Sequence, residues 1–311
     1  MERMARSGLV ALALAAMLTA GTPALAKQTA PHEASRAELL RRAEHGDVKA
    51  YDLLANNYLE AKGNLRDVEA AVRWLQVGVK AGDTDCMIDL GNLYYDGDVL
   101  NQDSDRALSL YVAAAAKGDA LGAYNAGLVY ETSADDVAQA VSWYRRAAAG
   151  GDEGGMYKLA LAYQLGQGAP SDVGQAVTWM RRAAEAGSAD AVNDLGEYYS
   201  QGYGVAADPV QALKLYREAA RQGSAVAMAN IGAAYHDGEG VTADFQEARS
   251  WYIMAANGGD MAAYYDLGQM YEDGEGVKAS AAKAVELYRA ASESDDDDVS
   301  QAAETKCEQE T

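Results

Sequence analysis

The sequence is poor in the residues that form most catalytic and metal sites. Its 311 residues include two cysteines and three histidines, and the histidines are far apart, at His32, His45 and His236. Zinc sites require such ligands at short spacings, as in a His-Glu-x-x-His helix, and the sequence has no such cluster. A Gly-x-Ser-x-Gly motif, which marks the nucleophile of many serine hydrolases, is also missing. The sequence therefore predicts no metal centre, no cofactor and no catalytic residues.

Two cysteines are too few for the disulfide framework that small secreted domains use. We interpret Cys86 as a small buried helix residue and Cys307 as a thiol near the C-terminus. The spacing leaves open a bridge between the two. In either case, the stability of this chain must come mainly from the packing of apolar side chains.

Positive charge is scarce as well. The chain has 26 lysines and arginines against 47 aspartates and glutamates, which is a formal net charge of −21. A surface of this charge repels phosphate groups, so the composition predicts no nucleic-acid partner and disfavours binding to anionic lipid. The same charge favours a basic partner.

The longest apolar run lies near the N-terminus. Residues 8–20 are mainly apolar but too few to cross a bilayer as a helix, which takes about 20 residues. Two arginines precede this run, and the sequence Ala-Leu-Ala follows at residues 24–26. The arrangement is typical of a signal peptide, here residues 1–26. We therefore expect cleavage before Lys27 and export to the periplasm or the cell exterior, without stable membrane insertion.

Seven copies of one pattern account for most of the remaining chain. Each copy starts with a small residue, has Leu or another small or apolar residue four positions later, then Gly or Ala, and Tyr eight positions after the start. The copies lie 36 residues apart, with one step of 33. A period of this length predicts a solenoid of stacked two-helix units. The starting residues, which define offset 0 of each unit, are Ala50, Cys86, Gly122, Gly155, Ala191, Ala227 and Ala263.

Each unit is predicted to contain two amphipathic helices joined by a turn. In the first helix, the residues at offsets 0, 1, 4, 5 and 8 share one face. The last three units continue with a Gly-x-Gly-Val turn, after which Asp208, Asp244 and Ser280 stand where the N-cap of a second helix belongs. All four tryptophans occupy one phase of the second helix, which marks a core position. The third unit lacks the glycine turn between Tyr130 and Ala140, so we expect a tighter hairpin there.

This pattern resembles the Sel1-like repeat family, relatives of the tetratricopeptide repeats. The matching features are Ala-x-x-x-Leu-Gly-x-x-Tyr in the first helix, the Gly-x-Gly-Val turn, and Ala-x-x-Trp/Leu-Tyr-x-x-Ala-Ala-x-x-Gly in the second helix. The resemblance implies an all-α fold, a right-handed α-solenoid of seven antiparallel helix pairs over residues 50–291. It also implies an adaptor or scaffold role, with protein partners such as a membrane sensor or an envelope polysaccharide-export machine.

The two ends of the chain differ from the repeats. Residues 35–49 resemble a second helix without its partner, and we interpret them as an N-terminal capping helix that follows a linker at residues 27–34. At the other end, residues 292–311 contain four consecutive aspartates. Their composition predicts a disordered acidic tail.

The candidate binding surface is the remaining face of each first helix. Offsets 2, 6 and 9 lie opposite the core-facing arc, and in tetratricopeptide-like stacks the first helices line a concave groove. These positions vary between units and include an apolar and aromatic patch, which favours a peptide segment or a protein domain as ligand. An alternative is that they only cover the inner helices. The candidate residues are Ile88, Tyr95, Tyr124, Leu128, Tyr157, Leu161, Asn193, Glu197 and Tyr265.

The sequence thus favours a non-catalytic, exported scaffold that binds another protein. The alternative is a glycan- or peptidoglycan-binding protein in which Tyr124, Tyr157 and Tyr265 stack on sugar rings. A distant third is a β-lactamase-like enzyme, because Ser280-Ala-Ala-Lys283 matches the Ser-x-x-Lys motif of such enzymes. Their Ser-Asp-Asn and Lys-Thr-Gly motifs do not accompany it, and an N-cap role explains Ser280.

This interpretation of Ser280 predicts that the purified protein does not hydrolyse a chromogenic cephalosporin. The hydroxyl of an N-cap serine accepts a hydrogen bond from the backbone, and nothing next to it in the sequence activates it as a nucleophile. Hydrolysis above the uncatalysed rate that disappears in Ser280→Ala would contradict the interpretation. Ser280→Asp, which keeps a capping side chain, controls for a loss of helix stability.

Overall fold

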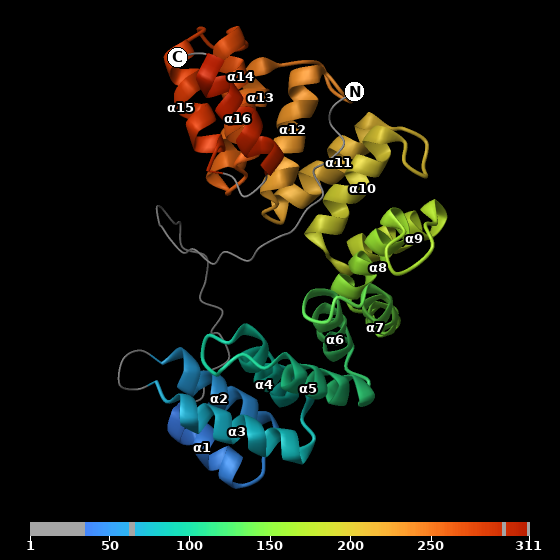
Figure 1. The fold of residues 1–311 in the computed structure, drawn as a ribbon, viewed down its shortest axis with the longest axis vertical. Coiled ribbons are helices and arrows are strands. Elements are labelled where there is room, and N and C mark those ends of the chain that lie inside the picture. The colour runs from blue at the N-terminus through green and yellow to red at the C-terminus, as the bar shows by residue number, and fades with distance from the viewer. Residues whose placement is uncertain (1–34, 62–65, 294–296, 310–311) are drawn as a thin grey trace, which may run out of the picture.

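The computed structural model describes residues 35–61, 66–293 and 297–309, so the predicted signal peptide and linker lie outside the described residues. Every regular element of the described residues is an α-helix, and the fold is the predicted all-α solenoid (Figure 1). We number its seven helix pairs as repeats 1 to 7. The pairs are α2 (Lys49–Glu60) and α3 (Val68–Ala81), α4 (Thr84–Asp96) and α5 (Ser104–Ala116), α6 (Ala120–Thr132) and α7 (Val137–Ala149), α8 (Glu153–Leu165) and α9 (Val173–Ala186), α10 (Ala189–Gln201) and α11 (Pro209–Arg221), α12 (Ala225–Asp237) and α13 (Phe245–Asn257), and α14 (Ala262–Asp273) and α15 (Ala281–Ala291).

Consecutive helices pack against each other along the whole stack, so each repeat touches mainly its neighbours. Figure 1 shows the pairs following one another from the blue end of the chain to the red end. The first helices α2, α4 and α6 also approach one another, whereas no two second helices among the described residues come as close. The first helices therefore lie on the inside of the curvature in this part of the stack.

A close contact within most repeats joins a glycine of the first helix to a tyrosine of the second. Gly232 packs against the ring of Tyr252, and a Cβ at Gly232 would lie 2.7 Å from the ring carbon Cδ1. Both residues are buried, so a larger residue at either position has no free space to enter. The same contact occurs at Gly91–Tyr111, Gly127–Tyr144, Gly196–Tyr216 and Gly268–Tyr288.

The other two repeats exchange both partners of this contact. Repeat 1 has Ala55 and Leu75 at the equivalent positions, and repeat 4 has Ala160 and Met180. All four side chains are completely buried. Where the first helix has alanine in place of glycine, the second helix thus has a smaller aliphatic side chain in place of tyrosine. The exchange keeps the interface filled without overlap.

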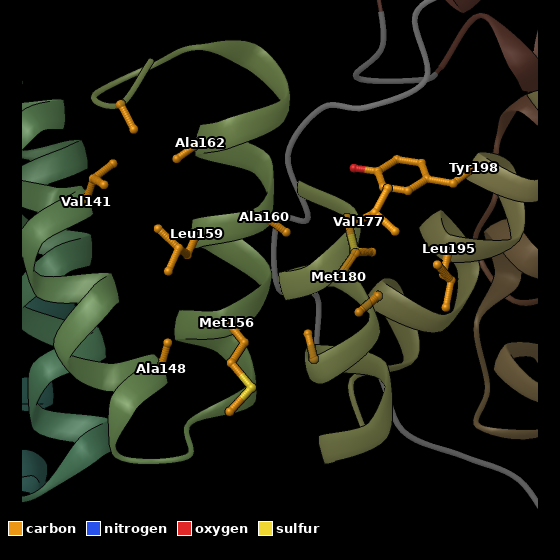
Figure 2. Packing of buried hydrophobic residues seen from close by; sticks show 13 residues of the cluster. Val141, Ala148, Met156, Leu159, Ala160, Ala162, Val177, Met180, Leu195 and Tyr198 are labelled. Carbon is orange, nitrogen blue, oxygen red and sulfur yellow. The ribbon is translucent and has the colours of Figure 1, made fainter. Parts of the chain in front are cut away.

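Apolar contacts continue from one repeat to the next in the middle of the stack. Leu159 and Ala160 of α8 share one buried cluster with Val141 of α7, Met180 of α9 and Leu195 of α10. Figure 2 shows these side chains between the ribbons of successive helices. Burial of one such leucine contributes about 1.5–3 kcal/mol, so the junctions between repeats hold a large part of the stability.

The turns and caps follow the sequence closely. The side chains of Asp208, Asp244 and Ser280 each accept a hydrogen bond from a backbone N–H in the first turn of a second helix. For Ser280 the donor is the N–H of Lys283, which confirms the predicted N-cap. Repeat 3 has the expected tight turn at residues 133–136. There Asp135 has a φ of 49°, the only positive φ of a non-glycine residue in the described part of the chain.

The glycine turns also hold each repeat against the one before it. Gly276, with a φ of 63°, lies against the first residue of α13, and a Cβ there would stand 2.7 Å from the Cβ of Phe245. Gly204 lies in the same way against Val173, the first residue of α9. Glycine is required here because it combines a positive φ with close approach to a neighbour.

Additional helices cover both ends of the stack. At the N-terminus, α1 (Arg36–Glu44) packs on α2 through Leu39 and Ala43. At the C-terminus, the predicted disordered tail is wrong for residues 297–309, which form α16 (Asp297–Gln309). This helix packs against α14 and α15, and Ala303 is completely buried beside Tyr288. It occupies the place that the first helix of a further repeat would take.

The physical reason for this correction is the apolar face of the last repeat. Val299, Ala303 and Cys307 recur every four residues and pack together on that face, which would otherwise contact water. The acidic composition of the segment concealed this spacing in the sequence. Cys86 and Cys307 are both free thiols, so the open bridge between them does not form.

The glycine–tyrosine contact predicts that Gly232→Leu destabilises the protein by about 1–3 kcal/mol, because the new side chain overlaps the ring of Tyr252. Gly232→Ala should cost less, and pairing it with Tyr252→Leu should restore part of the loss, since repeats 1 and 4 use that combination. Thermal denaturation of the single and double variants measures both effects. Ser250→Leu on the exposed side of α13 is the control, and an unchanged melting temperature in Gly232→Leu would contradict the proposed packing.

Candidate binding surface

The candidate surface consists of offsets −1, 2, 3, 6 and 9 of the first helices, which we call the inner face. Of the nine predicted binding residues, Ile88 and Asn193 are only 5% and 4% exposed, because neighbouring helices cover offset 2 at these positions. A partner therefore cannot reach these two side chains directly. A binding role for the others stays a prediction. The seven half-buried residues are Tyr95, Tyr124, Leu128, Tyr157, Leu161, Glu197 and Tyr265.

The inner-face tyrosines make contacts within the protein. The ring of Tyr124 lies against Tyr144, with 5.9 Å between ring centroids. Tyr265 packs on Tyr288 in the same manner, at 5.3 Å. The hydroxyl of Tyr95 lies 2.8 Å from the Thr132 hydroxyl of the next repeat. These rings therefore support the stack, and each leaves only part of its surface to a ligand.

A chain of hydrogen bonds crosses the inner face from repeat 4 to repeat 6. The hydroxyl of Tyr157 donates to Asp194 at 2.9 Å, and the Asn193 amide donates to Asp194 and to Glu197, each at 3.3 Å. Asn230 of α12 donates to the Asn193 carbonyl oxygen at 2.9 Å. Burial raises the pKa of Asp194, while the hydrogen bonds from Tyr157 and Asn193 act in the opposite direction. The chain couples three successive first helices.

Offset 3 is a row of the inner face that the sequence analysis did not include among the candidate positions. It lies as close to the middle of the polar arc as offset 2, and it is polar in every repeat except the first. Its side chains meet residues at offsets 2, 6 and 9 of the preceding first helix. The signal available in the sequence was the polar character of this row in six of the seven repeats. The row comprises Leu53, Asp89, Asn125, Lys158, Asp194, Asn230 and Asp266.

A carboxyl pair lies at the N-terminal end of this row. Asn56 of α2 donates to Asp52 at 3.3 Å and to Asp89 of α4 at 3.0 Å. Burial, the hydrogen bond with Asp89 and the negative charges of Asp89, Asp85 and Asp83 raise the pKa of Asp52 to about 8. The raised pKa favours the protonated form of the Asp52 carboxyl, which can donate a hydrogen bond to Asp89.

At two places a glutamate of the inner face binds both a tyrosine of the second helix and a lysine of the next helix along the stack. In repeat 3, the Tyr144 hydroxyl donates to Glu131 at 2.5 Å, and Lys158 of the next repeat binds the same carboxylate at 2.9 Å. In repeat 7, Glu272 accepts from Tyr288 at 2.5 Å and from Lys306 at 2.9 Å. The second lysine comes from α16, which supports the assignment of that helix as a substitute for a further first helix.

Offset −1 is the most accessible row of the inner face. Leu121 and Val226 are 46% and 44% exposed, which is high for large apolar side chains. Asp85 and Asp190 occupy the same offset in repeats 2 and 5 and are also exposed. The charge of Asp190 contributes to the raised pKa values of Asp194 and Tyr157, so it faces the same surface. The row thus presents carboxylates and apolar groups together.

The described residues contain neither a metal-binding cluster nor a membrane-spanning helix. No group of three or more His, Cys, Asp or Glu side chains in this part of the chain could hold a metal ion. None of its helices is both long and apolar enough to cross a membrane. What the inner face offers is a surface held in place by hydrogen bonds, with carboxylates and exposed apolar side chains suited to non-covalent contacts.

The raised pKa of Asp52 predicts a pH-dependent loss of stability that Asp52→Asn removes. The stabilising contribution of a group with a raised folded-state pKa is complete below its unfolded pKa, about 3.9 for Asp, and is lost as the pH rises through about 8. The difference in melting temperature, Asp52→Asn minus wild type, should therefore increase with pH up to about pH 8 and remain constant above it. Asp105→Asn on the exposed side of α5 controls for the loss of one negative charge, and a pH-independent difference for Asp52→Asn would contradict the shift.

Comparisons with known proteins agree with this architecture. Seven segments match the Sel1 repeat, at residues 48–83, 84–119, 120–152, 154–188, 189–224, 225–260 and 262–296. Comparison with curated proteins finds no matching sequence.

Two solved structures share the fold over most of the chain. One is c5321, a protective antigen present in uropathogenic Escherichia coli strains and displaying an SLR fold, which is 27% identical with a TM-score of 0.72 over 88% of this chain. The other is a Sel1 repeat protein from Oxalobacter formigenes, 26% identical with a TM-score of 0.68 over 83% of this chain. The chain spans 64% of the length of c5321 and 98% of the Oxalobacter protein. The chain belongs to the Sel1 repeat family.

Proposed function

We propose that this protein is an exported scaffold whose inner face binds a basic segment of a partner protein. Sel1 repeat proteins are generally non-catalytic scaffolds for protein interactions. The observation that carries this proposal is the offset −1 row, where the exposed carboxylates Asp85 and Asp190 stand one repeat before the exposed Leu121 and Val226. A segment with both cationic and apolar side chains complements that row.

Electrostatics supports a basic ligand. The chain carries a net charge of −21, and first-helix carboxylates such as Asp85, Asp89, Asp190 and Asp194 lie close enough to raise one another's or their neighbours' pKa values. A cationic ligand relieves this mutual repulsion and is drawn to the surface before contact. The hydrogen bonds between repeats hold the surface in one shape, so little conformational entropy is lost on binding.

Export is the second part of the proposal, and it rests on the N-terminal sequence alone. A membrane sensor or an envelope polysaccharide-export machine has protein segments that could carry the required charge. Glycan binding has less support from the tyrosines, because Tyr124 and Tyr265 pack on other rings and the Tyr157 hydroxyl is bonded to Asp194.

The proposal predicts that a fluorescent peptide of alternating lysine and leucine binds in low salt and that its acidic counterpart, with glutamate for lysine, does not. The double variant Asp85→Asn/Asp190→Asn should weaken binding roughly 3- to 10-fold, because two carboxylates leave the inner face. Glu185→Gln/Glu218→Gln removes the same charge from exposed positions of α9 and α11 and should have less than about a twofold effect. Fluorescence anisotropy measures all of these affinities.

Equal weakening by both double variants would show that net charge, not the inner face, attracts the peptide. Equal binding of the basic and acidic peptides would contradict a basic ligand. If the basic peptide does not bind and purified peptidoglycan retains the protein, the glycan alternative replaces the proposal.

A further inference from the structure

A small cavity opens between α13, α14 and α15, on the core side of α14 and away from the inner face. Its volume is about 190 Å³. The α14 residues that line it, Tyr264, Leu267 and Tyr271, stand at the core-facing offsets 1, 4 and 8. Ile253 of α13 and Leu287 of α15 supply further apolar wall. The cavity is therefore independent of the surface proposed above for a protein partner.

A difference between the repeats contributes to the space in this cavity. Leu287 occupies the phase of the second helix at which four other repeats have tryptophan, such as Trp251 in repeat 6. Leucine fills less volume than an indole ring, so space remains between the second helices of repeats 6 and 7. Apolar space of this kind favours an apolar ligand group over water.

Two cations line the cavity of this otherwise acidic protein, Arg249 and Lys283. The Nε of Arg249 is buried without a hydrogen-bond partner, the only buried side-chain nitrogen or oxygen of the described residues in that state. Its Nη2 makes one long bond, 3.4 Å, to the Tyr271 hydroxyl. Lys283 is paired with Glu286 at 2.7 Å, which leaves further N–H groups on its ammonium.

The guanidinium of Arg249 is therefore undersatisfied. A guanidinium has five N–H donors in a planar fork that matches a carboxylate, and a partly buried one without a carboxylate partner has lost hydration that nothing replaces. Among the described residues, no aspartate or glutamate forms an ion pair with Arg249. A ligand carboxylate would supply the missing acceptor.

We propose that this cavity binds a small monocarboxylic acid with an apolar body. The carboxylate pairs with the guanidinium of Arg249, with Lys283 adding positive charge at the same end. The apolar body lies against Ile253, Leu267 and Leu287. The cavity is too small for a folded partner, and its cations select an acid over a neutral molecule of the same shape.

Hexanoate is the probe for this site, and hexanamide is its neutral counterpart of nearly the same shape. Titration of the purified protein, followed by amide chemical shifts, should give saturable shifts for hexanoate in residues of α13 to α15. Hexanamide should bind at least about tenfold more weakly, since it lacks the charge-assisted hydrogen bond to Arg249. Equal binding of the two compounds, or no saturable binding of hexanoate, would overturn the proposal.

Leu287→Trp is the sharpest variant, because it restores the residue that other repeats carry and fills the cavity. It should abolish hexanoate binding while leaving the melting temperature equal or higher. Arg249→Met should weaken binding about tenfold or more, and Arg217→Met, which removes an arginine that bonds to Tyr235 one junction earlier, should leave it unchanged. A folded Leu287→Trp protein that still binds hexanoate would show that the ligand lies elsewhere.

Discussion

Five repeats of this solenoid depend on one contact, a tyrosine ring of the second helix packed closely against a glycine of the first. Because glycine has no side chain, the two helices approach closely and the ring fills the remaining space. The distance between the two helices is then the same in each of these repeats. Each repeat is therefore placed in the same way relative to the one before it. Ala55 with Leu75 and Ala160 with Met180 replace the contact in repeats 1 and 4, and in both cases the two residues change together. The packing thus constrains the combined volume of the two side chains and not the identity of either one.

The same tyrosines link the core to the polar side of the stack. The hydroxyl of Tyr144 reaches Glu131 and that of Tyr288 reaches Glu272, while Tyr111 donates to Asn92 at 2.7 Å. The core contact therefore positions the acids and amides of the inner face. Glu131 also binds Lys158 of the next first helix, and Glu272 binds Lys306 of α16, so these contacts help the stack to keep one arrangement of its surface although each repeat touches mainly its neighbours. A surface held in this way suits a scaffold, which must present the same contacts each time it meets a partner.

The candidate site was only partly predictable. Offsets 2, 6 and 9 do lie on the polar side of the first helices, but Ile88 and Asn193 proved to be buried, because the adjoining helices cover them. The offset 3 row, including Asp89 and Asp194, lies at the same angle from the middle of the polar side as offset 2. It makes many of the hydrogen bonds between repeats. Helix periodicity assigns a residue to an arc, whereas burial depends on how far the next repeat reaches over that arc. The reach follows from the tilt between repeats, which no single-helix pattern contains.

By itself, the sequence determined the helix pairs, the register of seven units, the capping residues and the tight turn of repeat 3. These features depend on local periodicity, turn glycines and N-cap side chains, which act within a few residues of one another. Only the tertiary structure decided that residues 297–309 form a covering helix, that burial beside Asp89 raises the pKa of Asp52, and that a cavity lies between Leu287 and Arg249. Each of these depends on atoms from different helices being within a few ångströms, and that proximity is set by packing between repeats. Local pattern therefore defines the unit, and contacts between units define what its surfaces can do.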